Sequence, residues 1–307
     1  MSENSFNHVI SCEQFTKEML EELYALTNDI IAKPRKYTNS LAGKLVATLF
    51  YEPSTRTRLS FEAAVLRLGA QIISTENAKE ASSVLKGESL EDTIKTVMGY
   101  ADGIIIRHSD VKSSEIAASV SKVPIINAGA GKGEHPTQAL LDLYTILAKH
   151  GDITGLNVAV SGDLTYGRTI HSLVKLLSLY KNITIYGVSN EHFKLPQEYI
   201  NYLAQKGVEY IECSCFEEVP NYVQVLYHTR TQLERLEDKT IKVEELIVDK
   251  DVLSRFPDNA ILMHPLPRVA EIHTNVDEDP RAVYFEQAHN GMKVRQALLL
   301  KLLNKDY

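Results

Sequence analysis

One turn of the sequence brings hydroxyl and guanidinium groups close together. Residues 54–58 read Ser-Thr-Arg-Thr-Arg and lie between an apolar run and a helical pattern. A helix cap explains Ser54 or Thr55 but not the arginines, because the positive end of the helix dipole disfavours cations in the first turn. A bound anion reverses that sign, and backbone N–H groups, hydroxyls and an arginine fork together suit a phosphate group. The turn therefore predicts a phosphate site.

A second turn, residues 129–138, is rich in glycine and precedes a long helical pattern. It differs from a P-loop, because Lys132 is not followed by Ser or Thr and the first glycine of that motif is missing. Pro136 suits the first helical position, which places His135 and Gln138 at a helix start, where both can hydrogen-bond a neutral amide or carbonyl group. For His135 alone, a capping role without function remains an open alternative.

Further turns at expected strand ends carry Arg or His side chains: Arg168, His228 with Arg230, and His264 with Arg268. Each of these turns alone is explained as an ordinary solvated turn. Together with the first turn they make four strand ends with Arg or His, in a chain whose net charge is −7. This convergence favours a small anionic substrate.

The composition excludes several classes of protein. The chain has 307 residues, and its 33 Lys and Arg against 40 Asp and Glu leave no global basic surface for nucleic acid or an anionic membrane. No apolar run approaches the roughly 18 residues of a membrane span, and the first residues lack the pattern of a signal peptide. Three cysteines without a CxxC pair or zinc spacing predict neither a disulfide framework nor a metal site. We therefore expect a cytoplasmic protein that binds no metal.

Apolar, β-branched runs alternate with helical patterns, which predicts an α/β fold of mainly parallel sheets with helices on both faces. The runs cover residues 45–49, 103–106, 123–127, 156–161, 183–188, 223–227 and 260–263. The helix after the first run is expected over residues 57–69, with an apolar stripe of Leu59, Ala63, Leu66 and Ala70. In such sheets ligands bind outside the carboxyl ends of the strands, which is where the turns described above lie.

The length of the chain leaves room for about two domains of roughly 100–200 residues. Residues 136–150 form a long helical pattern, after which a second series of strands and helices begins. A domain boundary is therefore expected in or near this helix. The apolar residues 297–303 predict a terminal helix that docks on one of the domains, and periodicity alone does not say which.

Three motifs taken together resemble the aspartate/ornithine carbamoyltransferase family. They are Ser54-Thr55-Arg56-Thr57-Arg58, His135-Pro136-Thr137-Gln138 and His264-Pro265-Leu266-Pro267-Arg268, and the resemblance covers nearly the whole chain in order. The ornithine enzymes typically have Cys where this chain has Pro265. That residue, with Arg230 and Gln232, points to the branch of the family that uses a dicarboxylic acceptor.

The resemblance implies two α/β domains, one for each substrate. Residues 1–134 with the C-terminal helix 291–307 would bind carbamoyl phosphate, residues 135–150 would form the interdomain helix, and residues 151–290 would bind aspartate. The implied reaction transfers the carbamoyl group to the α-amino group of L-aspartate, giving N-carbamoyl-L-aspartate and phosphate in de novo pyrimidine biosynthesis. No cofactor is expected.

The resemblance also implies a role for each site residue. The phosphate would be held by Ser54, Thr55, Arg56, Thr57 and Arg107. The carbamoyl oxygen would be polarised by Thr57, Arg107 and His135, and the carbamoyl amino group would be held by Gln138 and the Leu266 carbonyl, next to Pro267. The aspartate carboxylates would be bound by Arg168, Arg230 and Gln232. Glu52 would bridge to Arg168 and Arg235 when the domains close.

The polar residues 74–89 alone indicate only a mobile surface loop. The resemblance gives them a purpose, because Ser82 and Lys86 would reach into the active site of a neighbouring subunit in a homotrimer. The residues expected to act in catalysis are therefore Arg56, Thr57, Lys86, Arg107 and His135. Regulatory chains are left open as further partners.

Two functions from other classes remain as alternatives. An NAD(P)-dependent oxidoreductase would rest on the strand, turn and helix at Gly162, but the glycines there are spaced GxxxxG and not GxGxxG. Nicotinamide absorbance changes would identify such an enzyme. The other alternative is an anion-binding protein of the periplasmic type, which the expected lack of a signal peptide disfavours and which phosphate release from carbamoyl phosphate and aspartate would exclude.

Overall fold

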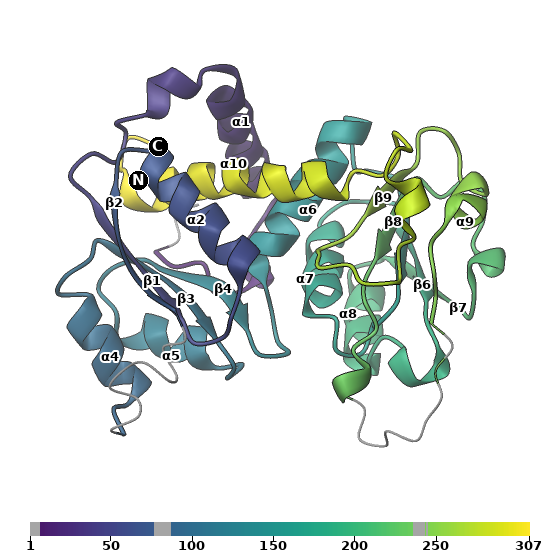
Figure 1. The fold of residues 1–307 in the computed structure, drawn as a ribbon, viewed down its shortest axis with the longest axis horizontal. Helices are drawn as coiled ribbons and strands as arrows, with labels where there is room; N and C mark the ends of the chain where they lie inside the picture. The colour runs from purple at the N-terminus through teal and green to yellow at the C-terminus, as the bar shows by residue number, and fades with distance from the viewer. Residues whose placement is uncertain (1–6, 77–86, 236–242, 244) are drawn as a thin grey trace. The chain divides into compact units, whose positions relative to one another are not determined.

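The computed structural model describes residues 7–76, 87–235, 243 and 245–307. Ser82 and Lys86 lie outside these residues. The chain divides into two compact units, coloured along the chain in Figure 1. Unit 1 comprises Met1–Leu141 and His289–Tyr307, and unit 2 comprises Asp142–Ala288.

Unit 1 is built on a four-stranded parallel sheet in the order β2-β1-β3-β4. Its strands are β1 (Leu45–Phe50), β2 (Gln71–Glu76), β3 (Gly103–His108) and β4 (Ile125–Ala130). Its helices are α1 (Lys17–Ala32), α2 (Thr55–Arg67), α4 (Leu90–Val97) and α5 (Ser113–Val120), with the short 3₁₀ turns η1 (Cys12–Gln14) and η2 (Pro34–Tyr37). Two long helices, α6 (Pro136–His150) and α10 (Tyr284–Leu303), each contribute residues to both units.

Strand β1 is buried on both faces, because alternate residues pack against different helices. Ala47 and Leu49 share a core cluster with Ile94 of α4 and Ala117 of α5. Thr48 faces the other way, and its hydroxyl donates to Glu62 of α2. Helices on both faces of a parallel sheet confirm the predicted fold class.

Unit 2 repeats this architecture with five parallel strands in the order β7-β6-β5-β8-β9. The strands are β5 (Asn157–Ser161), β6 (Thr184–Val188), β7 (Glu209–Cys213), β8 (Val225–His228) and β9 (Ile261–Met263). The helices wholly within the unit are α7 (Arg168–Leu177), α8 (Gln197–Gln205) and α9 (Lys250–Ser254), with 3₁₀ turns η4 (Glu191–Phe193), η5 (Phe216–Glu218), η6 (Leu233–Arg235) and η7 (Thr274–Val276).

The predicted apolar stripe of the helix after β1 is wrong for its two leucines. Leu59 and Leu66 are 51% and 60% exposed, whereas Phe61, Ala64 and Val65 are fully buried. The helix begins at Thr55, two residues before the predicted start, and it packs the neighbouring stripe against the sheet. The exposed leucines therefore lie outside the core of unit 1.

The terminal helix also differs from the prediction in extent. The apolar residues 297–303 form only the last part of α10, which begins at Tyr284. Within the described residues no helix is both long enough and apolar enough to cross a membrane.

Candidate active site

In unit 1 the predicted phosphate and carbamoyl residues follow three neighbouring strands. Phe50 pairs with Arg107 across β1 and β3, and His108 pairs with Ala130 across β3 and β4. Because the strands are parallel, their carboxyl ends meet at one edge of the sheet. That edge carries the start of α2, the side chain of Arg107 and the turn that leads to His135.

Helix α2 begins with an uncommon arrangement of hydroxyl groups. Ser54 is the N-cap residue, yet its side chain makes no capping hydrogen bond to the described first-turn amides, and Thr57 in the first turn is buried. The first four N–H groups of a helix have no partner within the helix. The start of α2 therefore has backbone donors that can meet an anion.

The two arginines of this turn have different environments. Arg58 lies 2.8 Å from Glu76 and 3.7 Å from Glu62, so its charge is balanced within unit 1. Arg56 pairs with no carboxylate of the described residues, and partial burial lowers the pKa of its guanidinium from the usual value. Arg56 is therefore the cation of this turn that is suited to a bound anion.

Arg107 is anchored beside the same turn. Its Nε atom lies 3.8 Å from Oε2 of Glu52, and its guanidinium donates to the carbonyl of Ala128 at 3.3 Å. Its backbone carbonyl accepts from the amide of Tyr51 at 2.8 Å, which ties the end of β3 to the segment that leads into α2. The structure thus places Arg107 at the same sheet edge as the start of α2. The predicted bridge from Glu52 to Arg168 and Arg235 would join the two units and stays a prediction.

Helix α6 begins at Pro136, as predicted, with His135 directly before it. His135 is buried, and its carbonyl accepts from the amide of Gln138 at 3.0 Å. The two residues are therefore held together at the first turn of α6, where a neutral polar group can meet both side chains.

In unit 2 the ends of β5 and β8 approach each other closely, and Gly162 makes this possible. Its φ is 99°, and a Cβ atom there would lie 2.1 Å from the carbonyl oxygen of Thr229. No side chain fits at that distance, so a glycine is required. The close approach places Asp163, the next residue, beside the segment that carries Arg230 and Gln232.

Asp163 holds this segment in place, a role that the sequence did not reveal. Its carboxylate accepts from the backbone and side-chain nitrogens of Gln232 at 3.2 and 3.1 Å, and from the amide of Tyr166 at 2.8 Å. Burial raises the pKa of Asp163, and the hydrogen bonds from Tyr166 and Gln232 oppose that rise. Asp163 therefore connects the turn before Arg168, the first residue of α7, to the turn that holds Arg230. The signal for it in the sequence was an aspartate two residues after the end of a strand.

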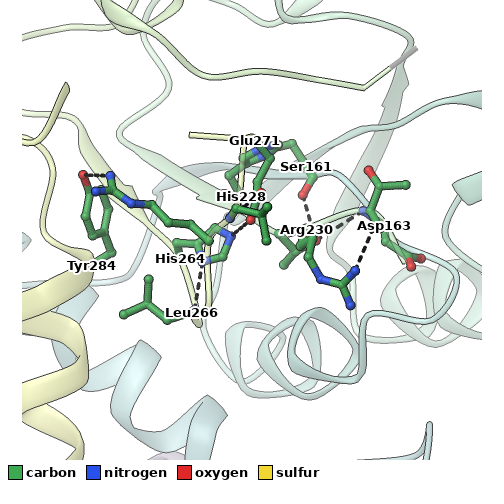
Figure 2. Close-up of polar contacts among 12 residues, drawn as sticks. Ser161, Asp163, His228, Arg230, His264, Leu266, Glu271 and Tyr284 are labelled. Atoms are coloured by element: carbon green, nitrogen blue, oxygen red, sulfur yellow. Dashed lines mark hydrogen bonds and ion pairs between the residues drawn. The ribbon is translucent and has the colours of Figure 1, made fainter. Parts of the chain in front are cut away.

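The third turn of unit 2 follows β9 and is built on buried polar contacts (Figure 2). Nδ1 of His264 accepts from the amide of Leu266 at 2.8 Å, and its Nε2 lies 2.9 Å from Oε1 of Glu271. Leu266 has a φ of 55°, and the peptide bond between Leu266 and Pro267 is cis. Sequence reasoning found Leu266 and Pro267 through the family motif but missed Glu271, because no spacing rule links it to His264.

Two further motif residues of this region have structural partners. Arg268 pairs with Asp277 through both terminal nitrogens and donates to the hydroxyl of Tyr284. His228 is fully buried, with its Nδ1 2.7 Å from Oγ of Ser161. Burial and the neighbouring His264 lower the pKa of His228 to about 3, so its ring is neutral at pH 7. The sequence analysis counted both residues among the side chains that favour an anionic substrate, but in the structure Arg268 is paired with Asp277 and His228 is buried and neutral.

The described residues contain no group of three or more His, Cys, Asp or Glu side chains arranged to hold a metal ion. What each unit offers instead is arginine, hydroxyl, amide and imidazole groups at the carboxyl edge of its own sheet. Such groups bind phosphate and carboxylate and can stabilise a developing oxyanion.

Comparisons with known proteins match both units in chain order. Residues 7–148 match the family model described as the carbamoyl-P binding domain of aspartate/ornithine carbamoyltransferase, and residues 154–302 match that of its Asp/Orn binding domain.

Individual proteins are similar over almost the whole chain. The chloroplastic aspartate carbamoyltransferase of Arabidopsis thaliana is 49% identical over 301 residues, which cover 96% of this chain and 77% of that protein. The aspartate carbamoyltransferase catalytic subunit of Clostridium novyi is 48% identical over 299 residues, which cover 96% and 97%. The crystal structure of aspartate transcarbamoylase from Trypanosoma cruzi with carbamoyl aspartate and phosphate superimposes with a TM-score of 0.89 at 39% identity, covering 97% and 96% of the chains.

Proposed function

This chain belongs to the aspartate/ornithine carbamoyltransferase family, and on that premise we propose that it is an aspartate carbamoyltransferase. It transfers the carbamoyl group of carbamoyl phosphate to the α-amino group of L-aspartate, a reaction of de novo pyrimidine biosynthesis. One observation carries the proposal: each unit matches one substrate-binding domain of the family, and the carboxyl edge of its sheet carries groups suited to that substrate. Unit 1 presents a phosphate-type helix start, and unit 2 presents arginines and an amide suited to a dicarboxylic acid.

Carbamoyl phosphate binds at the carboxyl edge of the sheet in unit 1. The phosphate accepts from the start of α2, through the hydroxyls of Ser54, Thr55 and Thr57 and the guanidinium of Arg56. Arg107 adds a second cation beside it. Unlike Arg58, whose charge is balanced by Glu62 and Glu76, Arg56 has no carboxylate partner among the described residues, so it gains most from an anion.

The chemical step is an attack of the aspartate amine on the carbamoyl carbon. A C–N bond forms, and the carbonyl oxygen gains charge that Thr57, Arg107 and His135 stabilise, a contribution of about 3–4 kcal/mol for each well-placed donor. The C–O bond to phosphate then breaks, and the leaving phosphate accepts the proton lost by the amine. Alignment of the amine with the carbamoyl carbon supplies much of the remaining acceleration. Gln138 and the Leu266 carbonyl orient the carbamoyl amino group.

Acceptor choice lies in unit 2. Arg168, Arg230 and Gln232 bind the two carboxylates of aspartate, and Asp163 fixes Gln232 by two hydrogen bonds. Ornithine carries a second amino group where aspartate carries its second carboxylate, so these arginines would repel it. Pro265, where ornithine enzymes typically have Cys, supports the same choice.

The assembly we propose is a homotrimer with shared active sites, in which Ser82 and Lys86 act in the neighbouring subunit. The cytoplasm is the proposed location, and the three free cysteines, Cys12, Cys213 and Cys215, agree with a reducing compartment.

An acceptor competition tests the reaction. Purified protein is incubated with carbamoyl phosphate and equal concentrations of aspartate and ornithine, and both carbamoylated products are quantified. We expect N-carbamoyl-aspartate with only background citrulline. Citrulline as the main product would place the chain in the ornithine branch, and no product with either acceptor would contradict the proposed function.

A mixing experiment tests the shared site. Trimers made only of Lys86→Ala chains, or only of Arg56→Ala chains, should be nearly inactive. When the two are dissociated, mixed and reassembled, some interfaces join an intact Arg56 to an intact Lys86, and activity should return. This requires a closed head-to-tail ring, in which each chain gives its segment to one neighbour. Trimers confirmed by sizing but without recovered activity would place Lys86 in its own subunit's site.

A further inference from the structure

A buried polar pair lies directly behind the turn after β9. The side chains of His264 and Glu271 are only 1% and 5% exposed, and Nε2 of His264 lies 2.9 Å from Oε1 of Glu271. The backbone amide of His264 also donates to Oε1 of Gln287 at 2.9 Å. An imidazole and a carboxylate at this depth need partners, because an unpaired buried polar group is costly.

The hydrogen bonds define which nitrogen of His264 carries the proton. The amide of Leu266 donates to Nδ1 at 2.8 Å, so Nδ1 must present a lone pair. The proton then lies on Nε2, which is 2.9 Å from Oε1 of Glu271. Burial alone would raise the pKa of Glu271, but the contacts with His264 and with the amide of Val269 outweigh it and hold the pKa at about 2. The charged carboxylate therefore selects the tautomer that can accept from Leu266.

Leu266 needs such an anchor, because its backbone is in a conformation that leucine rarely adopts. Its φ of 55° lies in the left-handed region, which is unfavourable for residues other than glycine. Such a residue keeps this conformation only when its surroundings hold it. The hydrogen bond from its amide to His264 is a contact that does so (Figure 2).

We propose that His264 and Glu271 are positioning residues that fix the Leu266 peptide for recognition of the carbamoyl amino group. The inference rests on the proposed function, in which the Leu266 carbonyl accepts from that amino group. His264 and Glu271 act through the backbone of Leu266 and need not touch either substrate.

Acetyl phosphate provides a probe for this role, because it has a methyl group in place of the amino group of carbamoyl phosphate. A displaced Leu266 carbonyl should raise KM for carbamoyl phosphate and leave the inhibition constant of acetyl phosphate nearly unchanged. The measured quantity is the preference, defined as the inhibition constant of acetyl phosphate as a competitor divided by KM for carbamoyl phosphate. A general distortion of the site would change both constants by a similar factor and leave their ratio, the preference, unchanged.

Two variants of His264 form a matched pair. Asn and Leu have the same branched shape, but only Asn places an oxygen near the position of Nδ1, where it can accept from Leu266. Both variants lose the contact with Glu271. The effect of that loss therefore cancels when the Asn variant is compared with the Leu variant. We expect His264→Leu to lower the preference by about 10-fold or more, since misplaced binding groups cost up to about 100-fold, and His264→Asn to stay within about 3-fold of the parent.

Two variants of Glu271 test the tautomer in the same way. Gln and Met have similar length, but only Gln offers an oxygen to Nε2–H of His264. Glu271→Gln should keep the preference, and Glu271→Met should lower it as His264→Leu does. Thermal unfolding of all four variants shows whether each is folded.

The outcomes separate this inference from the proposed function. If the parent protein makes no N-carbamoyl-aspartate, the proposed function fails. If the parent is active but both folded apolar variants keep its preference for carbamoyl phosphate, His264 and Glu271 have no positioning role. Equal losses in the Asn and Leu variants would also overturn the inference, because they would show that the acceptor for Leu266 is irrelevant.

Discussion

Removing one hydroxyl from the core of unit 2 should destabilise it measurably. Tyr227 on β8 is fully buried, and its hydroxyl donates to Oδ2 of the equally buried Asp142 at 2.8 Å. The side chain of Thr169 hydrogen-bonds the same hydroxyl. Tyr227→Phe leaves the ring in place and deletes only these contacts, so packing is otherwise unchanged.

The size of the effect follows from the charge and burial of the partner. A hydrogen bond to a charged group contributes about 1.5–3 kcal/mol, and no water can replace the hydroxyl at this depth. Asp142 retains its contact with Gln287 at 2.7 Å, so the carboxylate is not left alone. We therefore expect a loss of about 2 kcal/mol, which for a unit of this size lowers Tm by about 4–8 °C.

Calorimetry of the parent and two variants provides the assay. Tyr186→Phe is the matched control, because within the described part of the chain the Tyr186 hydroxyl hydrogen-bonds the hydroxyl of Tyr222 at 3.2 Å, and Tyr222 is 55% exposed. Water can replace that contact, so the control should lose less than about 0.5 kcal/mol. If Tyr227→Phe were no less stable than Tyr186→Phe, the buried hydrogen bond would contribute nothing and the reasoning would be refuted.

Three further changes have defined outcomes. Arg56→Ala should raise KM for carbamoyl phosphate by about 100-fold or more while the protein stays folded, since it deletes a guanidinium that binds phosphate; near-normal activity at modest substrate would contradict this. Arg230→Ala should chiefly raise KM for aspartate, and an equal increase in KM for both substrates would contradict the assignment of Arg230 to the aspartate site. Because the pKa of His228 is lowered to about 3 from 6.5, the unfolded chain binds the proton more readily, so stability should fall as pH drops below about 6.5. Urea midpoints between pH 7 and 5 should therefore fall more in the parent than in His228→Asn.

The central strands and the helix over residues 136–150 could be predicted because each leaves a clear pattern in the sequence. Strands β1, β3, β5 and β8 are covered on both faces, so each is a nearly continuous apolar run. The helix over residues 136–150 was predicted with the bounds that the structure has, because Pro136 marks its first position.

The two strands that the sequence did not reveal, β2 and β7, lie at sheet edges. Most of their residues are exposed or only half-buried, including Gln71 and Glu209 at their first positions, so no apolar run marks them. The last residues of β2, from Ser74 to Glu76, were interpreted as the beginning of a loop, since their side chains are polar. A strand at an edge tolerates such residues because one side of it faces solvent.

Sequence motifs suggested candidate site residues, but they gave no sign of contacts that only the fold creates. Arg56 and Arg230 occur in recognisable turns, but Asp163 acts on Gln232, which is far away in the sequence. Strands β5 and β8 are far apart in the sequence and become neighbours only in the folded sheet, where Gly162 lies close to Thr229. Contacts of this kind have no local signature.

Unit 2 is one continuous segment, whereas unit 1 is interrupted by it and completed only by residues 289–307. Those last residues contribute Ala297, Leu298 and Leu300 to the buried interior, and Lys301 pairs with Glu22 of α1 at 2.7 Å. As the chain emerges from the ribosome, unit 2 is therefore fully synthesised before unit 1 can be. The usual order, in which the N-terminal domain is completed first, is reversed here, and the apolar surface that Ala297, Leu298 and Leu300 cover stays uncovered until residues 289–307 have been made.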